Sequence, residues 1–511
     1  MKILFIKPNL EIDAVWDPIR TCNYIGIWGL ASLLIKKGHN VVYLDETVRE
    51  NGLSKKSVFI REIDKTNNIT EQPLGVSYKD FQNQKIEDYS NMTSRDFIKK
   101  YSAFREGTIR RVMVKVGLPE EETLQKVEEE MPDYVGIPLI ASANYLSATR
   151  LARKIKKTYP QIKIIFGGQH VSSMPNEFLK ENPWIDHIVI GDGITVIEGI
   201  INGTIKEKII YGGFQEMDEF PLLNPEVIKD TNYPLTPNHS YATQGRKWID
   251  FMFSRGCHRK CDFCVAGSTP GCHITATDYD LLDEQLRVLK GAGYQELIVQ
   301  DDAFLWDKRH LKQHLPKILS LMKKYEFFWQ NNGGIDFEAT DEFVINEILK
   351  YNQDGISKCT SLYIPFNPRG WNKNQSASRS MIGKFHDNLK NLKKLREAGI
   401  YIFTSSILGT PEQTPETFIE ELKSDQNLIT EGYIDSALPL SATMLPGTKW
   451  FANNGHNIIN KKDYSGYSLF ATHHRTDYFQ AAEIEELMIC WLKGLDKTQK
   501  AFFWQTAFPN S

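Results

Sequence analysis

The chain has 511 residues, 41% hydrophobic and 24% charged, with a formal net charge of −3 and a pI near 6.5. This length accommodates two to four domains, and the nearly balanced charge provides no general electrostatic field for nucleic acid. No apolar run approaches the length of a transmembrane helix, and seven scattered cysteines do not suggest a disulfide framework. We therefore expect a cytoplasmic protein with neither nucleic acid nor a membrane as its partner.

The first part of the chain predicts a doubly wound parallel sheet. An apolar strand over residues 3–6 ends in a Pro8-Asn9 loop, and a helix over 26–37 leads to a second strand over 41–46. The pattern resumes after residue 132 with strands near 134–141, 162–168 and 185–193, separated by helical segments. Alternation of this kind is typical of Rossmann-like folds, which bind ligands beyond the carboxyl ends of their strands.

Two stretches interrupt or end this pattern. Residues 47–132 are polar and charge-rich, with helical patches at 93–104 and 120–130 and no strong strand, so they predict a helical insertion. Residues 203–247 contain four prolines that break any long element, which indicates a linker. A second domain is expected to begin near Trp248.

Three of the seven cysteines lie within eight residues, in a loop after a short apolar strand. Cys257, Cys261 and Cys264 form the pattern C-x3-C-x2-C. Three close cysteines without a fourth favour a [4Fe-4S] cluster whose remaining iron is open to a small molecule. The alternatives are a structural zinc site that uses His258 or Cys272 as fourth ligand, and unrelated buried thiols.

The segment after this loop predicts a partial barrel. Strands at 296–300, 327–334, 361–367, 400–409 and 435–444 alternate with helices, which makes six βα units with the strand before the cysteines. Catalytic loops of such folds lie at the carboxyl ends of the strands. Residues 449–511 predict a small helical region, in which we expect His473-His474 to occupy a solvated loop, with substrate contact as the alternative.

The cysteine spacing, with aromatic Phe263 before the third cysteine, is similar to the signature of the radical S-adenosylmethionine (SAM) superfamily. The preceding motifs KILFIKPN, GLASLLIKKGHNV, DYVGIPL, FGGQH and VIGDG resemble the cobalamin (B12)-binding domain of its B12-dependent members. The resemblance implies an α/β chain with a Rossmann-like, cobalamin-binding-type domain over 1–202 and a radical SAM partial (β/α)6 barrel over 248–448.

The resemblance also implies roles for individual residues. The three cysteines would hold the cluster, and Asp301 or Asp302, assisted by Gln300, would bind the amino group of SAM. A helix cap is the alternative role for either aspartate. The remaining SAM contacts expected are Phe263, Ile407, Leu408 and Gly409 near adenine, with core packing as the alternative for the apolar pair, and Asn367 near ribose.

Cobalamin would lie along the strand-end loops of the first domain. The residues expected to contact it are Asn9, Ser142, Gly167, Gly168, Gly191 and Gly193. No D-x-H-x-x-G motif occurs, so no histidine is expected beneath the cobalt, and His170 is expected to be a loop residue. The missing motif also suits a domain that has lost its cofactor.

In activity, the resemblance implies an enzyme whose reduced cluster splits SAM into methionine and a 5'-deoxyadenosyl radical. That radical would abstract hydrogen from an unactivated carbon of a small molecule, and cobalamin-dependent methyl transfer would follow. A reducing protein such as flavodoxin or ferredoxin would supply electrons. The alternatives are cyclisation, ring contraction or rearrangement without methylation, and a non-enzymatic iron-sulfur sensor, which would not need six βα units.

Overall fold

The computed structural model describes residues 1–15, 24–49, 52–53, 55–105, 107–229, 245–257, 261–266, 275–302, 304, 308–335, 337, 340–354, 358–365 and 381–496. Among them, backbone contacts define two compact units. One lies within Met1–Pro234 and Thr443–Arg475, and the other within Leu235–Gly267, Cys272–Ala442 and Thr476–Ser511. The domain bounds expected from the sequence remain a prediction about which parts fold independently.

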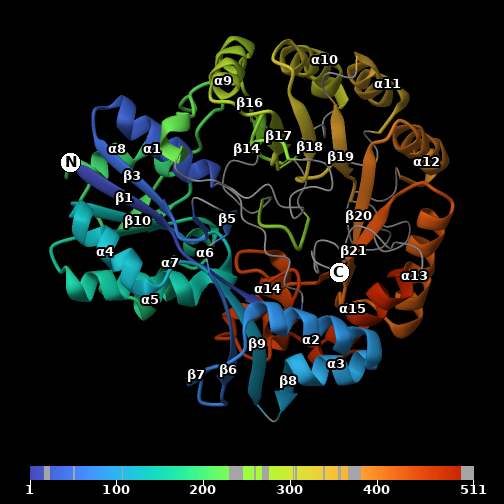
Figure 1. Cartoon of the computed structure of the whole chain (residues 1–511), viewed down its shortest axis with the longest axis horizontal. Coiled ribbons are helices and arrows are strands. Elements are labelled where there is room, and N and C mark those ends of the chain that lie inside the picture. Colours follow the sequence, from blue (N-terminus) through green and yellow to red (C-terminus); the bar gives the residue numbers. More distant parts are fainter. Residues whose placement is uncertain are drawn as a thin grey trace. The chain divides into compact units, whose positions relative to one another are not determined.

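The first unit contains a six-stranded, wholly parallel sheet in the order β13-β12-β11-β10-β1-β3. Its strands are β1 (Lys2–Lys7), β3 (Asn40–Asp45), β10 (Tyr134–Pro138), β11 (Lys163–Gly167), β12 (His187–Ile190) and β13 (Ile209–Tyr211). The connecting helices are α1 (Ile25–Lys36), α5 (Tyr145–Thr158), α6 (Gln169–Ser173), α7 (Pro175–Glu181) and α8 (Ile197–Ile201) (Figure 1).

Successive side chains of β1 enter two different cores. Ile3 and Phe5 pack with α1 and α8 on one face, whereas Leu4 and Ile6 pack with α5 and α7 on the other. This alternation follows from the two-residue period of a strand. A sheet covered on both faces confirms the predicted doubly wound, Rossmann-like fold.

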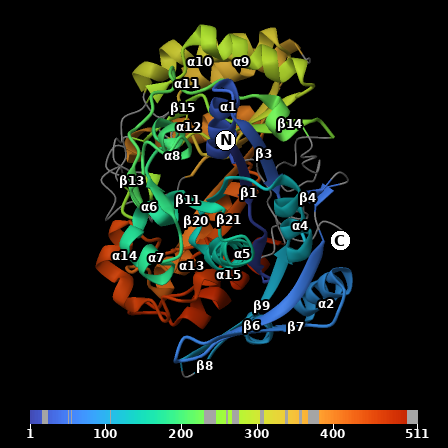
Figure 2. The same ribbon diagram turned by 90° about the vertical axis from the view of Figure 1, so that its left-hand side faces the viewer.

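Helices at 94–101 and 120–130 confirm the two helical patches predicted in the insertion over 47–132, but the expectation that it contains no strong strand is wrong. Four strands of a five-stranded antiparallel sheet lie in it, namely β6 (Lys56–Ile63), β7 (Ile69–Pro73), β8 (Ser102–Arg105) and β9 (Thr108–Val116), and the fifth is β2 (Leu10–Asp13), which precedes the insertion. Figure 2 shows β6, β7 and β9 as a layer separate from the parallel strands. Helices α2 (Tyr78–Asn91), α3 (Ser94–Tyr101) and α4 (Glu120–Glu130) accompany the sheet, and small strands β4 (Val48–Arg49) and β5 (Gly52–Leu53) precede it.

Buried charged residues explain why the sequence pattern did not predict these strands. Arg61 in β6 and Arg111 in β9 are each 1% exposed. Arg61 pairs with Glu11 and Glu71, and Arg111 pairs with Asp13 at 3.0 Å. Charged residues in a strand suggest a solvated surface, but here each charge is neutralised by a carboxylate from elsewhere in the fold.

Residues 443–475 belong to the first unit and carry α14 (Lys449–Asn454). Tyr464 stacks on Tyr145 with ring centroids 3.9 Å apart, and Asp463 forms a 2.9 Å ion pair with Arg111. The expected solvated loop at His473-His474 is wrong, because both side chains are fully buried. His473 stacks on Tyr467 and hydrogen bonds through Nδ1 to the carbonyl oxygen of Gly466.

The second unit contains six parallel strands in sequential order, β14-β17-β18-β19-β20-β21. They are β14 (Trp248–Phe251), β17 (Glu296–Val299), β18 (Phe328–Asn331), β19 (Cys359–Tyr363), β20 (Tyr401–Leu408) and β21 (Ser436–Ser441). The helices are α9 (Tyr279–Gly291), α10 (Lys308–Lys324), α11 (Glu342–Tyr351), α12 (Met381–Glu397), α13 (Pro415–Thr430) and α15 (Ala481–Asp496), and α9 to α13 follow the outer side of the strands (Figure 1).

Sequential parallel order is the arrangement expected of a partial barrel with right-handed βα units. It confirms the predicted α/β fold class. In the part of the chain that the structure describes, no helix combines the length and apolar character needed to cross a bilayer.

Candidate functional site

The cysteine loop begins at the carboxyl end of β14, and a small antiparallel hairpin holds its two ends together. Strand β15 (Ser254–Arg255) pairs with β16 (Thr275–Ala276), and the amide of Thr277 donates to the carbonyl oxygen of Phe253 at 3.0 Å. Chain on both sides of the cysteines is therefore fixed to the same strand end. A loop anchored in this way can present several thiols to one group.

All three predicted cluster cysteines lie in this loop, and none of them forms a disulfide bond with another described residue. Cys257 is buried, and Cys261 and Cys264 are half-buried. A turn joins the latter two, since the Cys264 amide donates to the Cys261 carbonyl at 3.1 Å. The alternative zinc ligands His258 and Cys272 lie outside the described residues.

Within the described ranges, no three or more His, Cys, Asp or Glu side chains converge on a position for one metal ion. A [4Fe-4S] cluster is larger, and each of its cysteines binds a different iron, so its thiolates need not converge on one point. Three thiols from one short loop therefore fit such a cluster in number and chemistry.

The two aspartates after β17 face the start of the same loop, but they differ in what their oxygens contact. Asp301 is fully buried and accepts hydrogen bonds from the Phe253 amide (2.9 Å) and the Ser254 hydroxyl (2.6 Å). Burial raises the pKa of Asp301 to about 7. Asp302 is exposed and accepts from the Gly256 amide at 3.1 Å.

Both carboxylates thus connect β17 to the residues immediately before Cys257. Because both Asp301 oxygens are engaged inside the protein, Asp302 is the better placed of the two to reach a ligand. The neighbouring Gln300 donates through Nε2 to Asp250 at 2.6 Å. Ser254, the partner of Asp301, carried no signal in the sequence.

The other expected SAM contacts lie partly at strand ends of the same sheet. Leu408 ends β20 as a buried residue, while Ile407 and Phe263 are half-buried. Gly409 has φ = +76°, and a Cβ there would lie 2.7 Å from the side chain of Ile484, so glycine is needed for this turn. Asn367 lies outside the described residues.

Asn331, at the end of β18, adds a polar group to this edge. Its side chain is fully buried, its Oδ1 accepts from the Gly334 amide at 2.7 Å, and its Nδ2 has no partner among the described residues. A Cβ at Gly333 would overlap the Asp301 carbonyl, so the loop after β18 packs directly against the Asp301 backbone. The ends of β14, β17 and β18 therefore form one continuous polar edge.

In the first unit, the residues expected to contact cobalamin follow the carboxyl ends of β1, β10, β11 and β12, which lie on one edge of the parallel sheet. Gly168 (φ = +104°) and Gly191 (φ = +79°) turn the chain there, and a Cβ at Gly168 would lie 2.7 Å from the Leu139 carbonyl oxygen. Gly167 and Gly193 allow ordinary side-chain room. This edge is where doubly wound folds bind nucleotide-like ligands.

Ser142 and His170 are committed to each other at this edge. The Ser142 hydroxyl and His170 Nδ1 form a 2.8 Å hydrogen bond, and His170 lies in α6 rather than in a loop. His170 packs against Tyr145 and Phe178, and burial lowers its pKa to about 4. A neutral, buried imidazole in this position is a packing residue.

A family model described as B12 binding domain matches residues 102–201, the stretch that contains β10, β11 and β12. The uncharacterised methyltransferase PH0819 of Pyrococcus horikoshii is 25% identical over 399 residues, which cover 73% of this chain and 81% of that protein.

Two solved structures share the fold. One is the radical SAM methyltransferase TsrM from Kitasatospora setae, solved with cobalamin and a [4Fe-4S] cluster bound. It has a TM-score of 0.52 at 12% identity, and the match covers 88% of this chain and 76% of the TsrM chain. The structure of the cobalamin-dependent SAM radical enzyme OxsB has a TM-score of 0.51 at 10% identity. The match covers 98% of this chain and 61% of the OxsB chain. These matches confirm the recognition made from the motifs: residues 102–201 match a B12-binding domain, and the chain shares its fold with solved cobalamin-dependent radical SAM enzymes.

Proposed function

We propose that this enzyme transfers a methyl group from SAM to an unactivated carbon of a small molecule, with a [4Fe-4S] cluster and cobalamin as its cofactors. One observation carries the proposal: a chain with a B12-binding domain also holds the C-x3-C-x2-C loop at the carboxyl end of the first of six sequential parallel strands. When bound, the cluster supplies the electron that cleaves one SAM into methionine and a hydrogen-abstracting 5'-deoxyadenosyl radical, and cobalamin carries the methyl group of a second SAM. PH0819 and TsrM are both named as methyltransferases, which supports methyl transfer over cyclisation or rearrangement.

In this proposal the residues of the second unit bind and orient the cluster and SAM. Cys257, Cys261 and Cys264 hold the cluster, while Asp301 fixes the start of their loop through the Phe253 amide and Ser254 hydroxyl. Asp302 is exposed beside that start and receives the cationic amino group of SAM. The remaining contacts proposed are Phe263, Gln300, Ile407, Leu408 and Gly409, with Asn367 toward the ribose.

The first unit contributes the edge formed by Ser142 and the strand-end glycines, whereas Asn9, the other residue expected there, lines a cavity with Glu46 and Lys115. Since His170 is buried against aromatic rings and the chain has no D-x-H-x-x-G motif, the proposal includes no histidine of this edge as a ligand that would bind the cobalt. The proposal assigns cobalamin to residues 1–202 and the radical chemistry to 248–448, joined by the linker 203–247. An oxygen-sensitive cluster also calls for a reducing compartment, so we place the enzyme in the cytoplasm with a flavodoxin or ferredoxin as reductant and no nucleic acid partner.

The experiment is anaerobic reconstitution followed by three measurements: iron per chain, 5'-deoxyadenosine formed from SAM, and corrinoid retained. Replacing Cys257, Cys261 and Cys264 together with alanine should remove the iron and the 5'-deoxyadenosine. Cys490→Ala, a thiol of α15, is the matched control and should leave both unchanged. A triple variant that still binds about four irons would refute the cluster assignment.

A further inference from the structure

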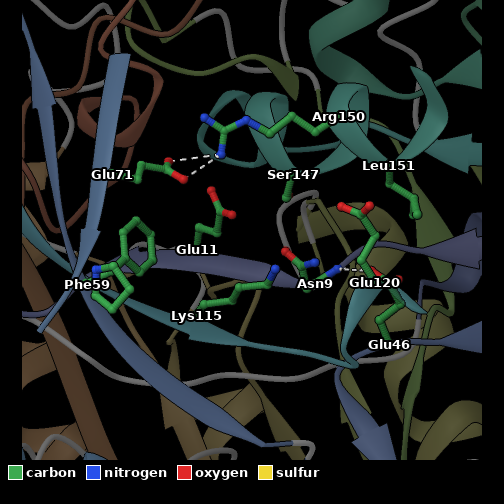
Figure 3. A pocket seen from close by; sticks show the side chains of 11 residues that line it. Asn9, Glu11, Glu46, Phe59, Glu71, Lys115, Glu120, Ser147, Arg150 and Leu151 are labelled. Carbon is green, nitrogen blue, oxygen red and sulfur yellow. Dashed lines mark hydrogen bonds and ion pairs between the residues drawn. The ribbon is translucent and has the colours of Figure 1, made fainter. Parts of the chain in front are cut away.

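A cavity of about 380 Å³ opens in the first unit (Figure 3). Its walls come from the end of β1, the residue after β3, the antiparallel sheet, and helices α4 and α5. The lining residues are Asn9, Glu11, Glu46, Phe59, Glu71, Pro73, Lys115, Glu120, Ser147, Arg150 and Leu151. We call it the Asn9 cavity; its volume lies within the range of small-molecule pockets in proteins, roughly 300–1,000 Å³.

Asn9 is held in this cavity by two contacts that fix its backbone. Its amide donates to Glu46 at 2.6 Å, and a Cβ at Gly117 would overlap the Asn9 side chain, so the missing side chain of Gly117 makes room for it. Asn9 is only 8% exposed, yet its Oδ1 has no hydrogen-bond partner among the described residues. A buried acceptor without a donor is costly, and a bound molecule can supply the donor.

The charges of the cavity leave one cation without a hydrogen-bonded counterion. Glu11 and Glu71 pair with Arg61, Glu71 also pairs with Arg150 at 2.9 Å, and Glu120 pairs with Lys154. Lys115 is half-buried and forms no salt bridge or hydrogen bond with any residue that the structure describes. Figure 3 shows Lys115 and Asn9 in the middle of the lining.

Glu46 is the remaining carboxyl group. It is 1% exposed and accepts hydrogen bonds from the Asn9 amide and the Thr123 hydroxyl. Burial raises the pKa of Glu46 to about 7, against a smaller opposing effect of the Lys115 charge, so Glu46 carries only part of a negative charge at neutral pH. The glutamates do not form a cation site, because no acidic, histidine or cysteine side chains within the described ranges are grouped for a metal ion.

These groups define the chemistry of a ligand. Lys115 requires an anion, and a singly charged carboxylate suits a cavity with four glutamates better than a doubly charged phosphate does. Asn9 Oδ1 requires a donor such as a hydroxyl or an amino group. Phe59, Pro73 and Leu151 contribute apolar side chains to the lining. We propose that the Asn9 cavity binds a small hydroxy or amino acid with an apolar side chain, whose carboxylate pairs with Lys115 and whose hydroxyl or amino group donates to Asn9.

Calorimetric titration of the full chain, without cofactors, tests this with four matched probes: 3-phenyllactate, phenylalanine, 3-phenylpropionate and 2-phenylethylamine. The first or second should bind. Phenylpropionate, which lacks the donor, should bind at least about tenfold more weakly, and phenylethylamine, which lacks the carboxylate, should not bind. No binding by either acid, or binding of the amine as tight as that of the acids, would overturn the proposal.

Variants assign the two contacts. Lys115→Met should weaken phenyllactate at least about tenfold, whereas Lys180→Met, a lysine of α7 outside the cavity, should not change it. Asn9→Ala should abolish the preference for phenyllactate over phenylpropionate, with circular dichroism confirming that both variants fold. Unchanged binding in Lys115→Met would refute the pairing, and displacement of phenyllactate by hydroxocobalamin would instead assign the cavity to the cobalamin site.

Discussion

Asp301 and Asp302 provide a sharp test of how this enzyme separates anchoring from ligand binding. Replacing Asp301 with alanine removes the acceptor of the buried Phe253 amide, whereas the Ser254 hydroxyl can rotate to another acceptor. An orphaned buried donor costs about 1–3 kcal/mol. Taking about 2 kcal/mol, the segment before Cys257 should open about thirtyfold more often, because each 1.36 kcal/mol is a factor of ten.

The assay is hydrogen exchange of the peptide that contains residues 251–257, combined with calorimetric SAM affinity of the reconstituted enzyme. Asp301→Ala should accelerate exchange about thirtyfold and lower iron retention. Asp302→Asn should leave hydrogen exchange nearly unchanged but weaken SAM binding by about 1.5–3 kcal/mol, or roughly 10- to 150-fold in affinity. If Asp301→Ala left exchange unchanged and weakened SAM instead, Asp301 would be the ligand and the anchoring argument would be wrong.

Three further predictions follow from buried groups of the first unit. Arg111→Met should lower the free energy of unfolding by about 3–5 kcal/mol, because it leaves the buried carboxylates of Asp13 and Asp463 without the Arg111 cation. Lys180→Met is the control and should change the free energy of unfolding little. Denaturant titration measures both variants, and equal effects would contradict the role of the Arg111 ion pairs. Burial depresses the pKa of His170 to about 4 from 6.5, so unfolded chain binds more protons between these values and stability falls as pH drops through this window, by about 3 kcal/mol in total. The same titration at pH 6.5 and 4 should show a smaller fall for His170→Gln, and identical curves would refute the assignment. Enzyme reconstituted with hydroxocobalamin and reduced should give a paramagnetic resonance spectrum without nitrogen superhyperfine splitting, and such splitting would reveal a nitrogen ligand beneath the cobalt.

Much of the architecture was predictable because it is recorded locally in the chain. The strands of the first parallel sheet are largely apolar runs, as expected when helices cover both faces, and the helices of both units keep a period that single segments reveal. The C-x3-C-x2-C motif is likewise local, since all three thiols lie in one loop and their spacing needs no distant partner.

The antiparallel sheet, four of whose strands lie within residues 47–132, was not predictable in the same way. Arg111 is separated from Asp463 by 352 residues along the chain, and Arg61 from Glu11 by 50. A charge in a strand indicates a solvated face until its partner is known, and that partner is brought close only by folding. The solvated position predicted for His473 was wrong for the same reason, because its burial depends on contacts with Tyr467 and the Gly466 carbonyl.

At the candidate site, the sequence by itself determined which residue types lie at the strand ends, but not which of them anchor the loop and which are exposed to a ligand. Asp301 and Asp302 are adjacent and chemically identical, yet one is buried against Phe253 and Ser254 and the other is exposed beside Gly256. Likewise Asn9 follows β1 as the pattern predicts, while the glycine and the glutamate that fix it come from residues 117 and 46. Spacing along a chain records local geometry, whereas burial and hydrogen-bond partners depend on segments that meet only in the tertiary structure.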